Sequence, residues 1–198
     1  GIDIGLKSKD IVIRDVTIAG MVDKGISVGE NSLVHIERTS VAQCNVGIAV
    51  KDQSMTTGDF LTLYGCDTAV VARTGGDVSL RNVIFAQSTI SHVKQTPDSR
   101  IFISYSLFDN QMVAGVGNLE GDPLFLAADK GDYRLQSGSP AINAGGPPAM
   151  LESDGTRVDI GSCPYLLSTG MSVVINEIEY QDSPGQETGD WIELFNNS

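Results

Sequence analysis

The sequence predicts an all-β fold, a right-handed parallel β-helix built from coils of 22–23 residues. Three observations predict it: a repeat that keeps its register, apolar residues that alternate within each repeat, and linkers too short to hold a helix. A period of this length is typical of solenoids, in which each repeat buries its apolar face against the next one.

Two series of paired residues step along the chain by 23, 22, 22 and 23 residues. The first series is Ile11/Ile13, Val34/Ile36, Thr56/Gly58, Val78/Leu80 and Ile101/Ile103, and the second is Val16/Ile18, Thr39/Val41, Leu61/Leu63, Val83/Phe85 and Ser106/Phe108. A third, earlier series is Ile2/Ile4, Ile26/Val28, Ile48/Val50 and Val70/Ala72. Paired residues are two apart, so each pair predicts a short strand. A leucine-rich repeat, the main alternative, needs a Leu and Asn framework that is absent here.

A polar corner follows the last strand of each coil. It reads Asp23-Lys24-Gly25, Asn45-Val46-Gly47 and Asp67-Thr68-Ala69. These residue types tolerate left-handed or turn conformations, so we expect a ladder of turns. Metal binding by Asp23 and Asp67 is the alternative, although turn chemistry already accounts for these residues.

Two of the three cysteines occupy the same position in neighbouring repeats. Cys44 and Cys66 are 22 residues apart, and Cys163 lies outside the repeats. Stacking places their Cα atoms ~4.8 Å apart, which is within the disulfide range. We expect two small residues in an internal stack, with a disulfide as the alternative. The sequence has no CxxC motif and no His near these cysteines, so zinc binding is not favoured.

Composition narrows the class of protein. Asp and Glu outnumber Lys and Arg 25 to 13, and the formal charge is −12. No basic stripe is present, which disfavours nucleic-acid binding. The sequence contains neither a membrane-spanning run nor a signal peptide. Because residue 1 already lies within the repeat, we expect more coils or a cap before it. The acidic, Gly-rich composition suggests a secreted or cell-surface protein.

The strict register fades after about Gln111, and three strings follow: "GDPLF" at 121–125, "DYRLQSGSPAINAG" at 132–145 and "DGTRVDIG" at 154–161. They resemble the C-terminal closing segment of bacterial pectate-lyase-like β-helix surface proteins. The resemblance covers residues 1–165 and implies an irregular last coil. We expect its apolar side chains to plug the open end of the core, namely Leu124, Phe125, Tyr133, Leu135 and Ile142.

The string from Asp154 to Asp159 also raises calcium as the one cofactor to consider. It lacks the acid spacing and terminal Glu of an EF-hand loop. We expect a turn with an internal Asp–Arg pair, and Asp154 and Asp159 remain weak candidates for a metal site.

A second domain is expected after residue 172. Residues 166–172 are typical of a linker, and residues 173–198 predict two alternating strands joined by a polar loop. The strings "INEI" and "WIEL" resemble the start of a lamin-tail domain, an immunoglobulin-like sandwich. The resemblance implies a truncated sandwich, since about seven strands are needed for a whole one, with Trp191 in its core.

One outward column contains the candidate catalytic residues: Arg14, Glu37, Asp59 and Arg81. Stacking places Glu37 and Asp59 roughly 5 Å apart, a separation that suits retaining glycoside hydrolysis or a shared calcium ion. The alternative is a structural charge ladder in which flanking arginines keep both acids ionised, and this alternative is favoured. His35 should face the same side.

A second outward column becomes apolar at Ile84 and Leu107, which predicts a packing surface. Known catalytic strings of pectate lyases and polygalacturonases are absent from the sequence. We therefore expect a non-catalytic extracellular or cell-surface module that acts as a spacer or in adhesion and assembly. The alternative is a carbohydrate-active or polysaccharide-binding β-helix whose site lies partly on coils outside this chain. Polysaccharides or neighbouring protein chains are the expected partners.

Overall fold

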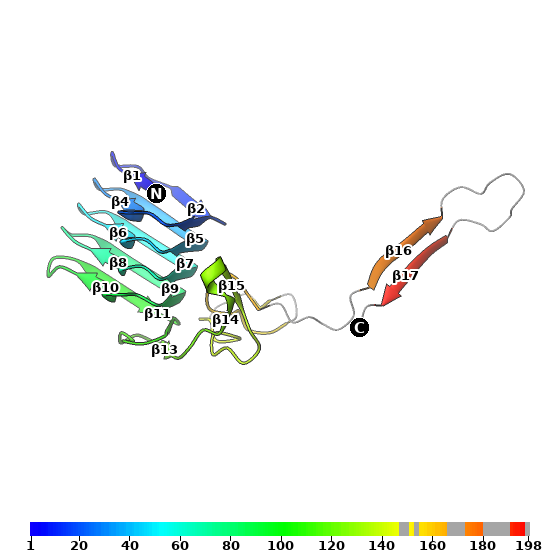
Figure 1. The fold of residues 1–198 in the computed structure, drawn as a ribbon. Coiled ribbons are helices and arrows are strands. Elements are labelled where there is room, and N and C mark those ends of the chain that lie inside the picture. The colour runs from blue at the N-terminus through cyan, green and yellow to red at the C-terminus, as the bar shows by residue number, and fades with distance from the viewer. Residues whose placement is uncertain (147–150, 153–154, 166–172, 180–190, 197–198) are drawn as a thin grey trace, which may run out of the picture. The chain divides into compact units, whose positions relative to one another are not determined.

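The computed structural model describes residues 1–146, 151–152, 155–165, 173–179 and 191–196, the last two ranges by their backbone alone. The chain divides into two compact units, Gly1–Tyr165 and Leu166–Ser198. The first unit is a β-solenoid of stacked parallel coils (Figure 1), so the predicted solenoid fold is confirmed.

The first strand of every coil contributes to a five-stranded parallel sheet, in the order β1-β4-β6-β8-β10. Its strands are β1 (Ile2–Ile4), β4 (Lys24–Val28), β6 (Val46–Val50), β8 (Thr68–Ala72) and β10 (Ser91–Gln95). The register follows the predicted repeat, since Ile26 pairs with Ile48 and Ile48 with Val70. The last strand, β10, extends the sheet one coil beyond the predicted series.

The other strands of each coil form a second parallel sheet. It contains β2 (Ile11–Arg14), β3 (Thr17–Ala19), β5 (Leu33–Ala42), β7 (Met55–Tyr64), β9 (Asp77–Ala86), β11 (Arg100–Ser104), β12 (Leu107–Phe108) and β13 (Leu119–Glu120). Three coils depart from the prediction. In each of them, the strands predicted from the first and second series of pairs are joined into one continuous strand, namely β5, β7 or β9. A left-handed residue still bends each coil at the predicted tight corner: Asp15, Arg38, Phe60, Asn82 and Tyr105.

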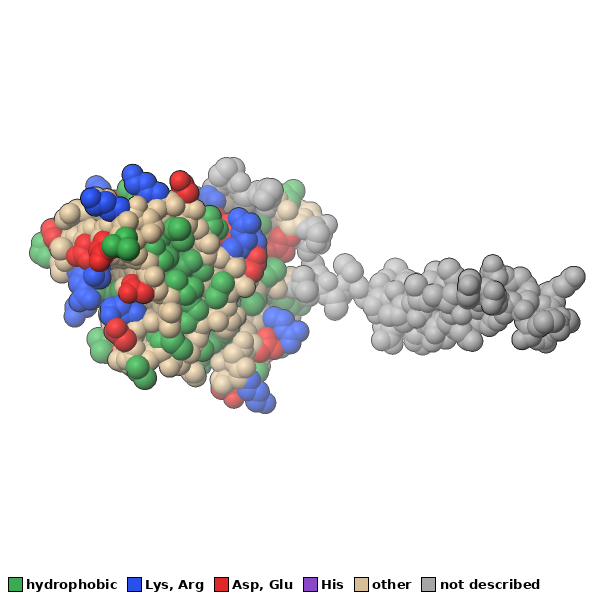
Figure 2. Space-filling model, turned by 90° about the horizontal axis from the view of Figure 1, so that it is seen from above, with side chains coloured by type: hydrophobic (Ala, Val, Ile, Leu, Met, Phe, Trp, Pro, Cys, Tyr) green, Lys and Arg blue, Asp and Glu red, His purple; other side chains and the backbone are tan. Residues whose placement is uncertain are grey.

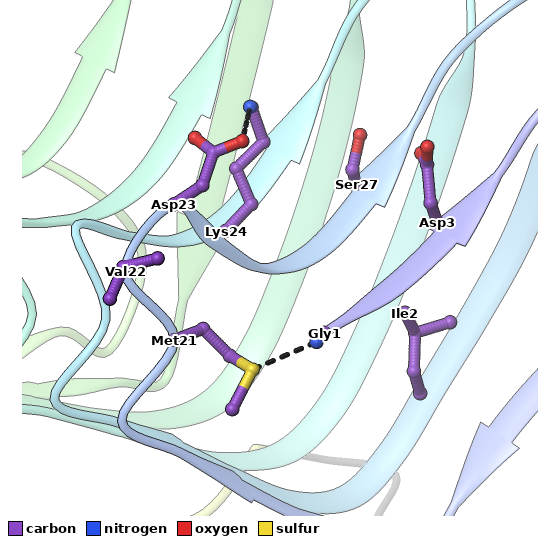
Figure 3. A pocket seen from close by; sticks show the side chains of 8 residues that line it. All are labelled: Gly1, Ile2, Asp3, Met21, Val22, Asp23, Lys24 and Ser27. Carbon is purple, nitrogen blue, oxygen red and sulfur yellow. Dashed lines mark hydrogen bonds and ion pairs between the residues drawn. The ribbon is translucent and has the colours of Figure 1, made fainter.

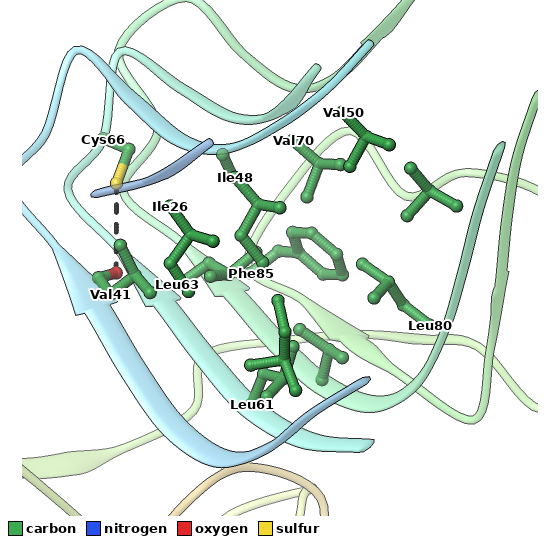
Figure 4. Close-up of a cluster of buried hydrophobic side chains, with 14 of the residues drawn as sticks. Ile26, Val41, Ile48, Val50, Leu61, Leu63, Cys66, Val70, Leu80 and Phe85 are labelled. Carbon is green, nitrogen blue, oxygen red and sulfur yellow. Dashed lines mark hydrogen bonds between the residues drawn. The ribbon is translucent and has the colours of Figure 1, made fainter. Parts of the chain in front are cut away.

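The core is a set of aliphatic columns closed by aromatic residues. Ile26, Ile48 and Val70 stack on one side, opposite the side chains of Leu61 and Leu63 (Figure 4). At the last coils, the rings of Phe85 and Phe108 stack with centroids 4.6 Å apart. Hydrophobic side chains also gather at the middle of the molecule in the view along the solenoid from the first coil, with charged groups around them (Figure 2).

The predicted ladder of turns at Asp23, Asn45 and Asp67 has a bend at each of the three residues, and none of the three is left-handed. The left-handed residues of this corner lie two or three positions earlier, at Gly20, Gln43, Gly65 and Gln87. Gly25 is required for a steric reason and not for its backbone conformation. A Cβ atom there would lie 2.8 Å from the carbonyl oxygen of Gly47 and would clash with the side chain of Val41. The glycines at this corner therefore permit close packing of neighbouring coils.

The closing segment does not plug the end of the core, contrary to expectation. It contains β14 (Phe125–Ala127), a 3-10 helix (Ala128–Lys130) and β15 (Asp132–Leu135), and it packs against the side of the second sheet. Its cluster joins Leu135, Ala141 and Ile160 to Ile84 and Leu107 of the coils. Ile84 and Leu107 are thereby buried, so the packing surface predicted at these two residues is confirmed.

The second unit contains β16 (Val173–Glu179) and β17 (Trp191–Asn196), which pair antiparallel. The two predicted strands are therefore present, while the assignment to a lamin-tail domain stays a prediction. The predicted linker at 166–172 and the predicted polar loop lie outside the described residues. Among the helices of the described residues, none has the length and apolar character required to cross a bilayer.

Candidate functional site

The four candidate residues stack in one column on the outer surface of the coils. Arg14 pairs in register with Glu37, Glu37 with Asp59, and Asp59 with Arg81. Each of them directly precedes the left-handed corner residue of its coil. The structure thus brings together all four residues, which we name the corner column.

Glu37 is held by arginines from two coils. It forms ion pairs with Arg14 and with Arg38, whose Nη1 lies 3.0 Å from Oε1 of the acid. His35 Nε2 lies 3.4 Å from Oε2, on the same side as predicted. Arg38 also donates two hydrogen bonds to Asp15, of 2.7 and 2.8 Å. These bonds from Arg38 hold the pKa of Asp15 below its usual value. The Glu37 side chain is 18% exposed, whereas the guanidinium groups around it are about half exposed.

Asp59 has a different environment one coil further on. Arg81 donates to Oδ2 at 2.7 Å, and Asn82 donates to Oδ1 at 2.7 Å. Asn82 is buried, and its side-chain oxygen accepts a bond of 2.7 Å from Gly146 of the closing segment. Its backbone oxygen accepts another from Gly161. The Asp59 side chain is 11% exposed. Its bond to Asn82 connects the corner column to the closing segment.

The chemistry available to the two acids follows from these partners. Retaining hydrolysis needs one protonated and one ionised carboxyl group. Both acids of the corner column have an arginine partner. The arrangement is therefore well suited to hold adjacent coils together.

Two residues of this site escaped the sequence analysis. Arg38 and Asn82 occupy the left-handed corner position, which belongs to neither of the alternating series. A signal existed, because the corner residues also recur every 22 or 23 positions. At this corner position, three coils have a polar or charged residue and two have an aromatic one: Asp15, Arg38 and Asn82, and Phe60 and Tyr105. Their partners depend on side-chain reach, which spacing alone does not specify.

A second polar cluster, formed by Ser88, His92 and Asp109, was also missed. His92 Nδ1 lies 2.9 Å from Ser88 Oγ. His92 Nε2 lies 2.9 Å from Asp109 Oδ1, although this contact is not aligned as a hydrogen bond. The residue types are those of a serine nucleophile and its base. However, the imidazole is 2% exposed and packs edge-on against the stacked rings of Phe85 and Phe108. The cluster therefore belongs to the core.

The candidate metal ligands have other partners in the structure. Asp159 is buried and accepts backbone bonds from Asn143 at 2.7 Å and Tyr165 at 2.5 Å. Arg157, the expected partner in this turn, lies 5.9 Å from the centroid of the Tyr105 ring. Asp154 lies outside the described residues, so the metal prediction for this pair stays untested.

The corner acids weighed as metal ligands also have partners. Asp23 pairs with Lys24 at 2.5 Å, and Asp67 accepts a bond of 2.6 Å from Thr89. Within the part of the chain that the structure describes, no group of three or more His, Cys, Asp or Glu side chains is arranged to hold a metal ion.

The cysteines are free thiols in this structure. Cys44 and Cys66 are buried on neighbouring coils, as the predicted internal stack requires. The sulfur of Cys66 points toward the carbonyl oxygen of Val41, 3.9 Å away (Figure 4). Burial raises the pKa of the Cys66 thiol to about 11, so this thiol is a poor nucleophile at neutral pH.

A hollow of about 300 Å³ lies beside the first coil. The amino group of Gly1 lies 2.8 Å from the sulfur of Met21 at its edge, and Asp23 and Lys24 on its border pair with each other (Figure 3). Ile2, Val22 and Ser27 complete its lining together with Asp3.

Comparisons with known proteins give little further guidance. No protein-family model matches the sequence, and no curated protein matches it. Among solved structures, one match is described as the crystal structure of pectate lyase Pel9A, at 9% identity and a TM-score of 0.36. It covers 82% of this chain and 67% of the other. At this TM-score the likeness carries no argument, and the parallel coils themselves establish the fold.

Proposed function

We propose that the β-helix is a non-catalytic structural module that acts outside the cell, as a spacer or as an element of adhesion and assembly. The observation that carries the proposal is the pairing of the corner column. Glu37 and Asp59 are the best placed acids for hydrolysis, and each is engaged by arginine. Their role is to join coils. The acidic, glycine-rich composition supports the extracellular setting.

The test is an assay of the full chain on acidic and neutral polysaccharides, with and without added Ca²⁺. We expect no cleavage product, measured as new reducing ends or as absorbance of unsaturated sugars. We also expect Asp59→Asn to lower the melting temperature. Cleavage by the parent protein that is abolished by both Glu37→Gln and Asp59→Asn would overturn the proposal, because it would give these acids a chemical role.

The second candidate function is a carbohydrate-active or polysaccharide-binding module. One observation favours it: Arg14, Arg81 and His35 remain 54%, 51% and 39% exposed around the acids. The guanidinium groups of Arg14 and Arg81, three coils apart in the column, can each bind a carboxylate of an acidic polysaccharide. Binding to an immobilised polyuronate that is lost in the Arg14→Gln, Arg81→Gln double variant would support this candidate over a plain spacer.

A further inference from the structure

The first sheet ends on β10. β10 is the last strand in its sheet and pairs only with β8 among the described residues. One repeat of 22 residues beyond β10, the chain reaches residues 113–117, which read Val-Ala-Gly-Val-Gly. This apolar segment is not a strand in the structure. No strand of the described residues therefore occupies the position next to β10 on the side away from β8.

The vacancy has a local cause, since other bonds hold the segment beneath β11. The N–H of Tyr105 donates to the carbonyl of Val116 at 2.8 Å. The side-chain amide of Asn118 donates to the carbonyls of Ile103 at 3.2 Å and Val113 at 3.0 Å. Gly115 lies so close to the Ile103 carbonyl that a Cβ atom would clash with it. The chain thus diverts away from the edge of β10.

A hollow of about 550 Å³ results between β10, β11 and residues 113–116. We name it the β10 groove. Val93, Ile101 and Ile103 give it an apolar lining, and Gln95, Ser79 and Ser104 add polar groups. Phe102 and Val116 on its border are 60% and 70% exposed. The volume lies within the ~300–1,000 Å³ that is typical of binding sites.

The edge of β10 supplies unpaired backbone groups. In a parallel ladder, the peptide groups of alternate residues point to opposite neighbours. The N–H of Thr96 donates to Ala72 in the coil above, at 3.0 Å. Residues of the opposite parity, Val93 and Gln95, therefore turn their N–H and C=O groups toward the vacant position. A ligand of this groove must satisfy backbone groups as well as cover apolar side chains.

We infer that the β10 groove binds an extended strand of a partner protein, which pairs with the edge of β10. An extended peptide is the ligand class that offers backbone donors and acceptors together with side chains at period two. The alternating apolar residues of the partner would face Val93 and Ile101. This inference rests on the proposed structural role of the β-helix, and it specifies the kind of partner that the β-helix binds.

The probe is a fluorescein-labelled peptide with the sequence of residues 45–52. It contains β6, which already pairs on both edges within this molecule, with β4 and with β8. We expect saturable binding to the full chain by fluorescence anisotropy. Gln95→Pro removes a free N–H and no existing ladder bond, and Phe102→Ser removes part of the lining. Each should weaken binding about tenfold, the equivalent of one lost contact of ~1.4 kcal/mol. Val12→Ser, at an apolar residue 52% exposed, is the matched control and should bind as the parent does.

Three outcomes overturn the inference. One is the absence of binding, and another is equal binding of a peptide with Ile48→Pro and Val50→Pro, which cannot form a strand. The third is a concentration-dependent dimer in light scattering that Gln95→Pro abolishes, which assigns the groove to a second copy of the chain. If Gln95→Pro does not fold, Phe102→Ser and the proline peptide decide. Polysaccharide cleavage would overturn the proposed function without any effect on these binding results.

Discussion

Glu37 and Asp59 occupy the same column one coil apart, yet they differ in what covers them. Glu37 lies among half-exposed groups, and Arg38 divides its bonds between Glu37 and Asp15. Asp59 shares its two oxygens between Arg81 and the buried Asn82, which binds the closing segment. The same chemical group is therefore a surface ion pair in one coil and part of the packed interior in the next.

The difference shows where the closing segment matters. Ala141, Ile160 and Ser162 contact the outer face of the second sheet, where Ser162 bonds to Ser40 at 2.7 Å and to Thr62 at 2.8 Å. Gly161 lies against Ile84 so closely that a Cβ atom would be 2.6 Å from its side chain. Packing of this segment converts an outward face into a second core. The arginine partners of Glu37 stay about half exposed, and ion pairs of exposed side chains contribute little to stability.

The largest expected effect concerns the apolar contact under the closing segment. Ile84→Ala should cost about 3 kcal/mol, since Ile84 is 1% exposed and its truncation leaves a cavity between coil and closing segment. Val12→Ala, at an outward residue that stays 52% exposed, should change stability very little. Limited proteolysis gives a second readout, because cleavage within residues 121–165 should become faster in Ile84→Ala alone. Unchanged proteolysis would contradict the packing argument.

The next effect follows from removing the covered acid. Asp59→Ala should lower the free energy of unfolding by about 2 kcal/mol, because the loss leaves the buried side-chain amide of Asn82 without its acceptor. Glu37→Ala, the matched change in the uncovered coil, should cost about 1 kcal/mol or less. Chemical denaturation of both variants measures the difference. Equal losses would show that the closing segment does not distinguish the two sites.

The contrast also marks how far the sequence could predict the molecule. The columns of Ile26, Ile48 and Val70 follow from periodicity, because alternation fixes which side chains face inwards. The same logic placed Glu37 next to Asp59 and identified Ile84 as a packing residue. It did not show that Asn82 joins Asp59 to Gly146, because that bond spans 64 residues and depends on how an irregular segment folds back. The expected plug of the core was wrong for the same reason.

A third expectation uses the aromatic contacts of the closing segment and high pH. Burial, together with the neighbouring Tyr64, raises the pKa of Tyr133 to about 12. Its ring centroid lies 5.5 Å from those of Tyr64 and Phe125. An unfolded tyrosine ionises near pH 10, so the neutral Tyr133 stabilises the fold fully below pH ~10 and loses this contribution as the pH rises toward ~12. Tyrosinate absorbance and the melting temperature, followed from pH 9 to 12, should show a steeper loss for the parent than for Tyr133→Phe. Parallel curves would contradict a shifted Tyr133.

The smallest effect belongs to the most exposed ion pair of the uncovered coil. The Asp15 and Arg38 side chains are 58% and 46% exposed, and hydrogen bonding to Arg38 lowers the pKa of Asp15. Its contribution to stability is present above the unfolded value near pH ~3.9 and is lost as the pH falls below it. Asp15→Asn should therefore change the melting temperature slightly at pH 7 and not at all at pH 2. Salt of about 1 M should erase the difference at pH 7, because it shortens the screening length to ~3 Å. Asp59→Asn should keep most of its effect in the same salt, since its partner Asn82 is buried. If salt also erased the effect of Asp59→Asn on the melting temperature, Asp59 would be as solvent-exposed as Asp15.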